Sequence, residues 1–330
     1  MRRKFLRQSA VGLMVGTFAL FASPTMAADD WPAAKPIELI VPFGPGSSPD
    51  TMARKVAEHA SEALGQTIVI QNKPGASGNL GTNLIAKAKP DGYTFGVSIT
   101  GPMVNNTILY SDLPYDPAKD IDPLTLAVHQ YNVLVVPEDS PLKSFDDLLD
   151  ALKDPENDFN FPSTGAGTVS HLSVELLLEH TGGNAVHVPY ASSPKAVTSL
   201  IAGDTDFSAL PPIAVMPMIK DGRLRALATV SADRLDFLPD VPTVNEFDDL
   251  SGIEGSGWMG FVAPAGMPDE IKAQLTDALR DALNDDDIKA HLENQYMEAV
   301  GNSPEEFRQY MDDDLERWGP LIKRLDLSVN

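Results

Sequence analysis

Cysteine is absent from the 330-residue sequence, and positive charge is scarce in it. Without cysteine the chain has no disulfide scaffold, no thiolate metal site and no cysteine nucleophile. The 25 lysine and arginine residues stand against 47 aspartate and glutamate residues, which gives a formal net charge of -22. An acidic surface repels phosphate backbones, so no nucleic-acid partner is expected. After the amino-terminal region, no uninterrupted apolar stretch approaches the length that a membrane-spanning helix needs.

Signatures of catalysis and of cofactor binding are also missing. The loops at Gly44 and Gly165 fail the dinucleotide fingerprint, because its third glycine is replaced by Pro49 and Ser170 respectively. The sequence has no phosphate-binding loop of the G-x-x-x-x-G-K-[ST] type, no G-x-S-x-G elbow and no H-E-x-x-H motif. None of the six histidines pairs with another at i,i+4 spacing. We therefore expect no enzyme activity, no cofactor and no metal.

The amino terminus has the order of an export signal. Arg2, Arg3, Lys4 and Arg7 precede a short apolar run, and a small-x-small site ends at Ala27. The sequence predicts that residues 1–27 are removed and that the mature protein lies in the periplasm. The arginine pair is similar to the twin-arginine signal, and a general secretory signal is the alternative.

The remaining chain alternates short apolar strands with amphipathic helices, which indicates an α/β fold. Its length favours two domains. Gly65, Gly182 and Gly203 are expected to end helices. The predicted strands are 37–43, 67–71, 93–99, 132–136, 159–162, 186–189, 206–210 and 224–231, and the predicted helices begin near 48, 80, 144, 170, 193, 268, 287 and 303.

Three strand–loop–helix units share one feature. Each places a loop rich in glycine or serine between a strand end and a helix start, at residues 43–50, 163–171 and 189–195. Ligands of open α/β sheets bind at such strand ends, and helix amino termini attract anions. The loops themselves carry no lysine or arginine ahead of their helices. They predict an anion held by backbone N–H groups and hydroxyls; ordinary βα turns are the alternative.

A series of motifs resembles one known family. The segment PFGPGSSPD at residues 42–50 resembles "PFPAGGSTD", and QNKPGASGNLG at 71–81 is similar to "ENRPGAGGNIG". Further matches follow in order at PDGYT, LPYDPAKD, HVPY, LPDVPT and GWMGFVAPAG. Together they identify the chain as similar to the Bug family, the extracytoplasmic solute-binding components of tripartite tricarboxylate transporters.

The resemblance implies a type II-like periplasmic-binding-protein fold, with a ligand cleft between two α/β domains. One domain would contain residues 28–127 and 256–330, and the other residues 128–255, with crossings near 127–132 and 255–262. The implied ligand is a small organic carboxylate, either a di- or tricarboxylate or an aromatic acid. The implied partners are the membrane subunits of the transporter, with the protein itself a monomer.

The resemblance also implies a set of ligand-binding residues. For Asp50 a helix-start role is the alternative, for Tyr190 a core position, and for Trp258 hinge packing. His171 is the histidine expected nearest the ligand. The expected set is Phe43, Gly44, Gly46, Ser47, Ser48, Asp50, Gly78, Asn79, Ser163, Gly165, Gly167, Thr168, Ser170, His171, Pro189, Tyr190, Ala191, Asp206 and Trp258.

One segment departs from the family pattern. Many relatives read "VDMMFD" where this chain has TDFSAL at residues 205–210, so Leu210 replaces an acidic residue. A leucine in the pocket would disfavour amino-acid ligands, with Asp206 as the nearest carboxylate that could bind an ammonium group.

Two other functions fit the same sequence. The loaded protein could present its ligand to a sensor kinase instead of a transporter. An exported hydrolase would need a nucleophile–base pair, and the motifs reveal none.

Overall fold

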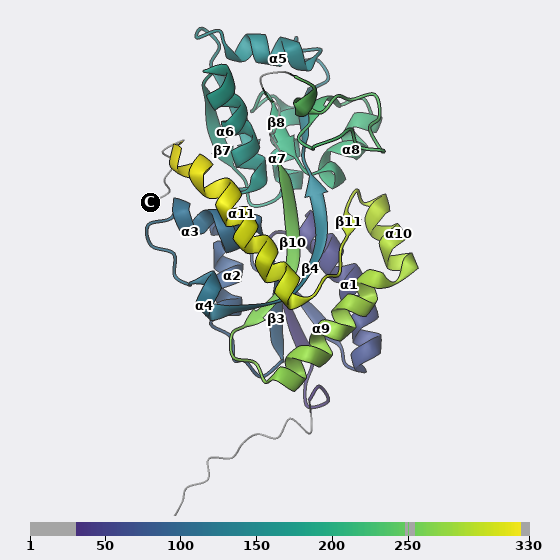
Figure 1. Cartoon of the computed structure of the whole chain (residues 1–330). Coiled ribbons are helices and arrows are strands. Elements are labelled where there is room, and N and C mark those ends of the chain that lie inside the picture. The colour runs from purple at the N-terminus through teal and green to yellow at the C-terminus, as the bar shows by residue number, and fades with distance from the viewer. Residues whose placement is uncertain (1–30, 248–249, 251–254, 325–330) are drawn as a thin grey trace, which may run out of the picture.

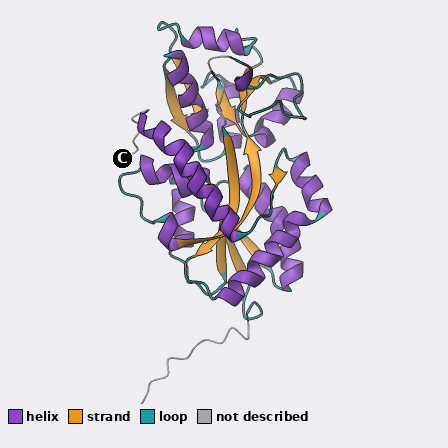
Figure 2. Ribbon diagram, in the orientation of Figure 1, coloured by secondary structure: helices purple, strands orange, loops and turns teal. Residues whose placement is uncertain are grey.

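The computed structural model describes residues 31–247, 250 and 255–324 (Figure 1). The expected export signal lies outside the described residues. Helices surround the sheets in two regions, and long strands run between them (Figure 2). The helix α11, Pro304–Arg324, extends along the molecule from the lower region toward the upper one.

A six-stranded mixed sheet forms the lower region. Its strand order is β11-β4-β10-β3-β1-β2, with β1 parallel to β2 and β3, and β10 antiparallel to β3 and β4. The strands are β1 Ile37–Val41, β2 Ile68–Asn72, β3 Thr94–Ile99, β4 Ile121–Tyr131, β10 Ser256–Pro264 and β11 Glu298–Ala299.

Helices cover both faces of this sheet because its strands carry apolar side chains on both sides. Leu39 belongs to a core shared with α1 and α9, while its neighbour Ile40 belongs to a core shared with α2 and α11. The other helices of this region are α1 Ser48–Leu64, α2 Asn79–Ala86, α3 Asn106–Leu109, α4 Pro117–Asp120, α9 Asp269–Asn284 and α10 Asp286–Asn294.

The upper region contains a three-stranded antiparallel sheet, β8-β5-β9, and a parallel pair, β6-β7. Asn132 alone separates β4 from β5, so the chain passes directly from one sheet to the other. The elements are β5 Val133–Pro137, α5 Phe145–Leu152, β6 Phe159–Ser163, α6 Val169–Thr181, β7 Ala185–Pro189, α7 Ser193–Ala202, β8 Ser208–Leu210, α8 Pro212–Lys220 and β9 Leu224–Thr229.

The predicted helix ends are confirmed. Gly65, Gly182 and Gly203 each adopt the left-handed conformation that follows a helix. Ser303 and Glu306 bond reciprocally at the start of α11, as a capping box does. From the sequence Ser48 is a candidate N-cap of α1, but in the structure Ser47 is the N-cap and Ser48 is the first helical residue.

Several elements escaped prediction. The long strands β4 and β10 occupy the segments interpreted only as crossings between domains. Both are nearly buried throughout and lack the alternation of a half-buried strand, so periodicity gave no signal. Helix α8 contains Pro217, which argues against a helix in the sequence. A π-helical turn, Gly101–Asn105, follows β3.

The two regions touch on both sides of the crossing strands. The Arg324 guanidinium pairs with both carboxylate oxygens of Glu179 on α6, at 2.6 and 3.1 Å. Leu172 of α6 packs in one apolar cluster with Trp318 of α11. On another surface, the Lys220 ammonium donates to the Tyr296 hydroxyl at 2.9 Å.

Candidate functional site

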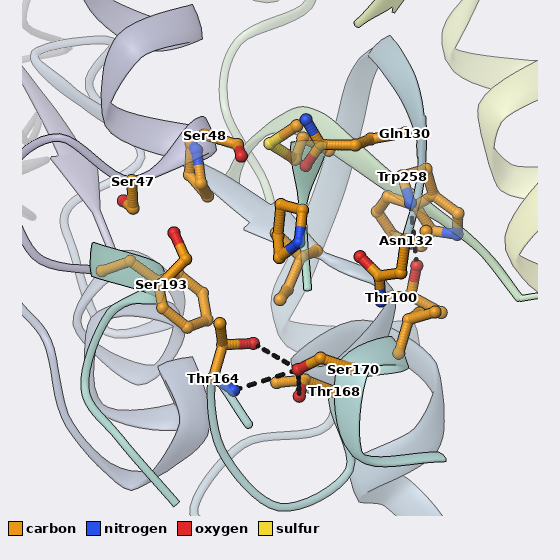
Figure 3. Close-up of a pocket in the computed structure, with 17 residues that line it drawn as sticks. Ser47, Ser48, Thr100, Gln130, Asn132, Thr164, Thr168, Ser170, Ser193 and Trp258 are labelled. Carbon is orange, nitrogen blue, oxygen red and sulfur yellow. Dashed lines mark hydrogen bonds between the residues drawn. The ribbon is translucent and has the colours of Figure 1, made fainter. Parts of the chain in front are cut away.

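A small cavity lies where the two regions meet, with a volume of about 70 Å³ (Figure 3). Its lining draws on β3, β4 and β10, on the starts of α1, α6 and α7, and on adjoining loops. Among the described residues no lysine, arginine, aspartate or glutamate lines it. The lining residues are Phe43, Ser47, Ser48, Pro49, Ile99, Thr100, Gln130, Asn132, Thr164, Thr168, Val169, Ser170, Ser193, Pro211, Gly257, Trp258 and Met259.

Three helices begin at this cavity, as the three loops of the sequence predict. Ser48, Val169 and Ser193 are the first residues of α1, α6 and α7 and all line it. None of the three N-cap side chains accepts a hydrogen bond from its own helix. The hydroxyls of Ser47 and Thr168 instead donate to the carbonyls of Gly44 and Gly165 in their loops. First-turn N–H groups therefore remain available to an anion.

The Ser170 hydroxyl is the centre of a hydrogen-bond cluster in one wall of the cavity (Figure 3). Its Oγ accepts from the Thr164 N–H at 3.0 Å and lies 2.9 Å from the Thr164 hydroxyl and 3.0 Å from the Thr168 hydroxyl. Ser170 is only 2% exposed. The cluster fixes the loop between β6 and α6 and presents hydroxyl groups toward a ligand.

Three buried donors around the cavity lack a partner within the described part of the chain. They are the Ser48 hydroxyl, the Ser193 hydroxyl and the Gln130 side-chain N–H₂ group. These residues are 2%, 1% and 7% exposed. A buried donor without an acceptor is costly, so such groups in a cavity indicate a ligand that accepts hydrogen bonds.

Trp258 forms part of the cavity wall and is held rigidly. Its indole N–H donates to the buried Asp314 carboxylate at 2.6 Å, and its backbone N–H donates to the Thr100 hydroxyl at 3.1 Å. Its ring meets Phe307 edge to face. The sequence left two roles for Trp258, in the cleft wall or in the packing of the hinge. In the structure Trp258 lines the cavity and also packs within β10, one of the crossing strands.

A pair of stacked histidines lies behind the loop between β6 and α6. The rings of His171 and His187 are 3.9 Å apart, and His187 contacts the Ser163 hydroxyl at 2.5 Å. The His171 Nδ1 atom accepts the Gly167 N–H, which leaves its Nε2–H directed at Glu175. Burial, and secondarily the nearby His171, lower the pKa of His187 to about 3. Neither histidine lines the cavity, so they support the loop from behind.

Only six residues of the expected set line the cavity, namely Phe43, Ser47, Ser48, Thr168, Ser170 and Trp258. Several others shape the loops behind it. Gly44 approaches Ser192, Gly46 donates to Asp50, and Gly78 packs against the Phe43 ring. Ser163, Gly165, Gly167 and His171 form the supporting network of the loop after β6.

The remaining expected residues lie elsewhere. The Asn79 side chain accepts from Asn106 and Tyr115 in a buried cluster. The Tyr190 hydroxyl donates to Ser199, and its ring packs on an apolar core, which matches the core alternative. Pro189 and Ala191 are exposed.

Asp50 occupies the helix-start position that the sequence left as an alternative. Its carboxylate accepts from the Gly46 N–H at 3.0 Å, from Arg54 and from Asn72. Burial alone would raise its pKa, but these hydrogen bonds hold the pKa below the ordinary value. Asp50 thus stabilises the first loop rather than facing the cavity.

The segment at residues 205–210 was expected to face the cavity, but it does not. The Asp206 carboxylate accepts from the Asn160 N–H at 2.8 Å, next to β6. Leu210 is fully buried in the core with Val133 and Val135, and only its neighbour Pro211 reaches the lining. The strand is therefore turned so that Leu210 cannot select against amino acids by direct contact.

Eleven lining residues were not singled out from the sequence. Thr164 and Ser193 lie in the predicted loops, whereas Gln130, Asn132, Gly257 and Met259 lie in the segments interpreted as crossings. The polar side chains of Gln130 and Asn132 in an otherwise apolar segment were the sequence signal that could have indicated a ligand site there. The rest are Pro49, Ile99, Thr100, Val169 and Pro211.

In the described residues no helix combines the length and apolar character needed to cross a membrane. Those residues also include no group of three or more histidine, aspartate or glutamate side chains placed to hold a metal ion.

The two-region α/β fold, with a small uncharged cavity lined by strands and helix starts of both regions, is that of a solute-binding protein of the periplasmic type. The chain belongs to the tripartite tricarboxylate transporter family receptor (TctC) family, whose pattern matches residues 52–327. This result confirms the Bug-family resemblance, because the chain is 33% identical to Protein BugT of Bordetella pertussis over 96% of both proteins.

Two similar solved structures contain carboxylates. R. palustris Rpa4515 with adipate is 31% identical, with a TM-score of 0.86 over 91% of this chain and 99% of that one. MatC (Rpa3494) from Rhodopseudomonas palustris with bound malate is 28% identical, with a TM-score of 0.83 over 88% of this chain and 99% of that one.

Proposed function

We propose that the protein captures a small organic carboxylate in the cavity between its two regions and delivers it to the membrane subunits of a tripartite tricarboxylate transporter. The observation that carries the proposal is a set of buried donors that have no partner among the described residues, in a cavity that no charged side chain of those residues lines. Hydroxyls, helix-start N–H groups and bridging waters can hold a carboxylate without an ion pair. The adipate and malate complexes of related proteins support this class of ligand.

The proposal includes export and a working motion. Membership of the family supports a location in the periplasm, with residues 1–27 as the signal. The proposal keeps one domain of residues 28–127 and 256–330 and a second of 128–255. Among the described residues, sheet membership supports this division except at residues 128–131, which belong to β4 of the six-stranded sheet. Both domains would rotate about the β4–β5 and β10 segments, closing on the ligand as monomeric binding proteins do.

The protein is proposed to release its ligand unchanged. The Ser163–His187 contact is the kind of pair a hydrolase would need, but Ser163 is fully buried and outside the cavity lining. The adjacent Gly165 N–H also donates to the Ser163 hydroxyl, which occupies one of its lone pairs. The pair thus stabilises the loop instead of attacking a substrate.

Identification of the carried ligand is the direct test. Mass spectrometry of molecules released when the purified protein is denatured should detect a small carboxylate. Calorimetry should then show binding of that acid and no binding of neutral sugars. A protein that binds sugars and no carboxylate would contradict the proposal.

Replacing Ser170 with alanine should weaken carboxylate binding by about 1–2 kcal/mol, the scale of a lost hydrogen bond to a charged group. The change removes the hydroxyl that organises Thr164 and Thr168. Thr198→Ala provides a matched control, because Thr198 is an exposed hydroxyl on α7 that bonds only to its own helix. Calorimetry should give an unchanged Kd for the control. Equal Kd values for both variants and the wild type would exclude Ser170 from the site.

A further inference from the structure

The surface formed by β2 and α2 in the lower region differs in charge from the rest of the chain (Figure 1). Residues 63–90 are the longest stretch after the amino-terminal region without an aspartate or glutamate, in a sequence that has 47 of these residues. The stretch contains Lys73, Lys87 and Lys89, and all three are exposed. This surface, the β2–α2 face, is therefore locally basic on a protein with a formal net charge of -22.

Exposed apolar side chains lie on the same face. Leu80 and Leu84 are 47% and 39% exposed and lie one helical turn apart on α2. Val69 of β2 is 38% exposed and lies two residues before Gln71, so both of these side chains point to the same side of the sheet. These are three of the five large apolar side chains that are exposed in the described residues, which makes them a cluster and not scattered single positions.

A groove of about 320 Å³ separates the two elements of this face. Leu84 lines it from α2, and Gln71 and Lys73 line it from β2 and the residue that follows. Glu38 is the one carboxylate among the described lining residues. Because β2 is the edge strand of its sheet, the described part of the chain leaves the groove open to a side chain from another molecule.

The lysines of the β2–α2 face are little used within the protein. Lys87 lies 4.0 Å from the Asp120 carboxylate, at the limit of an ion pair, and Lys73 and Lys89 have no ion-pair partner among the described residues. The excess of aspartate and glutamate elsewhere repels a negatively charged molecule. Complementary charge therefore steers an acidic partner to this face.

The combined features favour a protein segment over the other possible occupants. A symmetric pair of copies would place the same three lysines against each other. An anionic membrane would attract the lysines, but it would repel the acidic body of the protein and has no side chain to enter the groove. A protein segment with an apolar side chain between acidic residues satisfies the lysines, the leucines and the groove together.

Helix α2 also contacts the loop that lines the ligand cavity. A Cβ atom on Gly81 would lie 2.7 Å from the Pro42 Cα atom, and a Cβ atom on Gly78 would lie 3.1 Å from the Phe43 ring. Phe43 itself lines the cavity. A partner bound on α2 is therefore separated from the ligand by a single loop.

We propose that the β2–α2 face is the docking surface for an acidic segment of a partner protein, with an apolar side chain of that segment in the groove beside Leu84. The inference rests on the proposed function, which requires a protein partner and supplies one in the membrane subunits of the transporter.

Photo-crosslinking of the full chain, in the cells that naturally make it, tests the proposal. A benzophenone amino acid takes the place of Leu84, and the same probe at Leu315 is the matched control. Leu315 is 42% exposed, but its neighbours are Asp312, Asp313 and Glu316. Mass spectrometry of the crosslinked peptides should identify an acidic segment of a partner protein for the Leu84 probe and not for the control. Crosslinks to lipid, to a second copy or to a segment without acidic residues would overturn the proposal, and so would the absence of any crosslink.

Charge reversal tests the lysines themselves. Lys73→Glu combined with Lys89→Glu should lower the yield of the Leu84 crosslink at least about fivefold, because the face then repels an acidic segment. Lys153→Glu combined with Lys323→Glu gives the same net charge at two exposed positions elsewhere and should leave the yield unchanged. Thermal unfolding confirms that each variant folds, and glutamine replaces glutamate in any pair that does not fold. Equal yields in the two pairs would exclude the lysines from the interface.

The proposed function is judged by a separate measurement, the carboxylate carried by the purified protein. If a carboxylate is carried and the Leu84 probe finds no acidic segment, only the docking surface fails. A crosslink to an acidic segment of a sensor kinase would support the β2–α2 face and contradict delivery to a transporter. If no carboxylate is carried, the proposed function fails, and the crosslinks alone decide the docking surface.

Discussion

Replacing Gly167 with alanine is expected to weaken ligand binding by about 2–3 kcal/mol, or one to two orders of magnitude in Kd. Gly167 has a φ of +78°, and a Cβ atom built on it would lie 2.0 Å from Asn106 Oδ1 and 2.7 Å from Leu109 Cδ1. Asn106 and Leu109 belong to α3 in the lower region, whereas Gly167 lies in the loop before α6 in the upper region, so this contact joins the two regions. The added methyl would therefore push the two regions apart and destabilise the closed form that holds the ligand.

Gly182→Ala is the control for backbone strain. Gly182 also has a positive φ, +66°, but a Cβ atom there would meet nothing within 4 Å. Its substitution should lower the free energy of unfolding by about 1 kcal/mol and leave the Kd unchanged. Calorimetry and urea unfolding of both variants make the comparison. Wild-type affinity in Gly167→Ala would show that the close contact with α3 is not needed for binding.

Acidification is expected to destabilise the protein through His187. Its pKa is lowered from the ordinary value near 6.5 to about 3 by burial and by the adjacent His171. The unfolded chain therefore binds a proton that the folded protein excludes, so this stability is fully present above about pH 6.5 and is lost as the pH falls toward about 3. Between about pH 7.5 and about pH 5 the loss from this residue should be about 2 kcal/mol.

His187→Phe tests this expectation because it keeps an aromatic ring next to Phe161 and His171 but cannot titrate. Urea unfolding at the two pH values should show a smaller pH-dependent loss in the variant than in the wild type. His180→Gln, at an exposed position on α6, should leave the pH dependence unchanged. Equal pH dependence in His187→Phe and the wild type would mean that His187 does not hold its neutral form in the folded protein.

The sequence predicted most helices because their signals are local. The acidic capping box at Ser303 and the left-handed glycines at 65, 182 and 203 depend on neighbouring residues alone. The strands β4 and β10 were not predicted, because their burial depends on partners far along the chain. The pairing of Trp258 with His129 in these strands joins residues that no periodicity connects.

In the candidate site, too, the features set by neighbouring residues were predicted and those set by distant residues were not. The loops after β1 and β6 were predicted to meet an anion, and Ser48 and Ser170 do line the cavity. The sequence alone could not say that Leu210 is turned into a core or that the Asp206 carboxylate is bound to the Asn160 N–H instead of facing the cavity. Gln130 was not singled out, because the sequence does not show which distant residues surround it and so does not show that it lines a cavity.

By itself the sequence determined the α/β class, the family and the three helix starts that carry no positive charge, since composition, motifs and turn chemistry are properties of short segments. Only the tertiary structure decided which side chains reach the cavity. It brought Gln130, Ser193 and Trp258 together from distant parts of the chain and left the Gln130 and Ser193 donors without a partner among the described residues. It also buried Asp50 and Leu210 outside the lining. The physical reason is that strand rotation and packing between the two regions set the direction of each side chain, and both depend on contacts between residues far apart in the sequence.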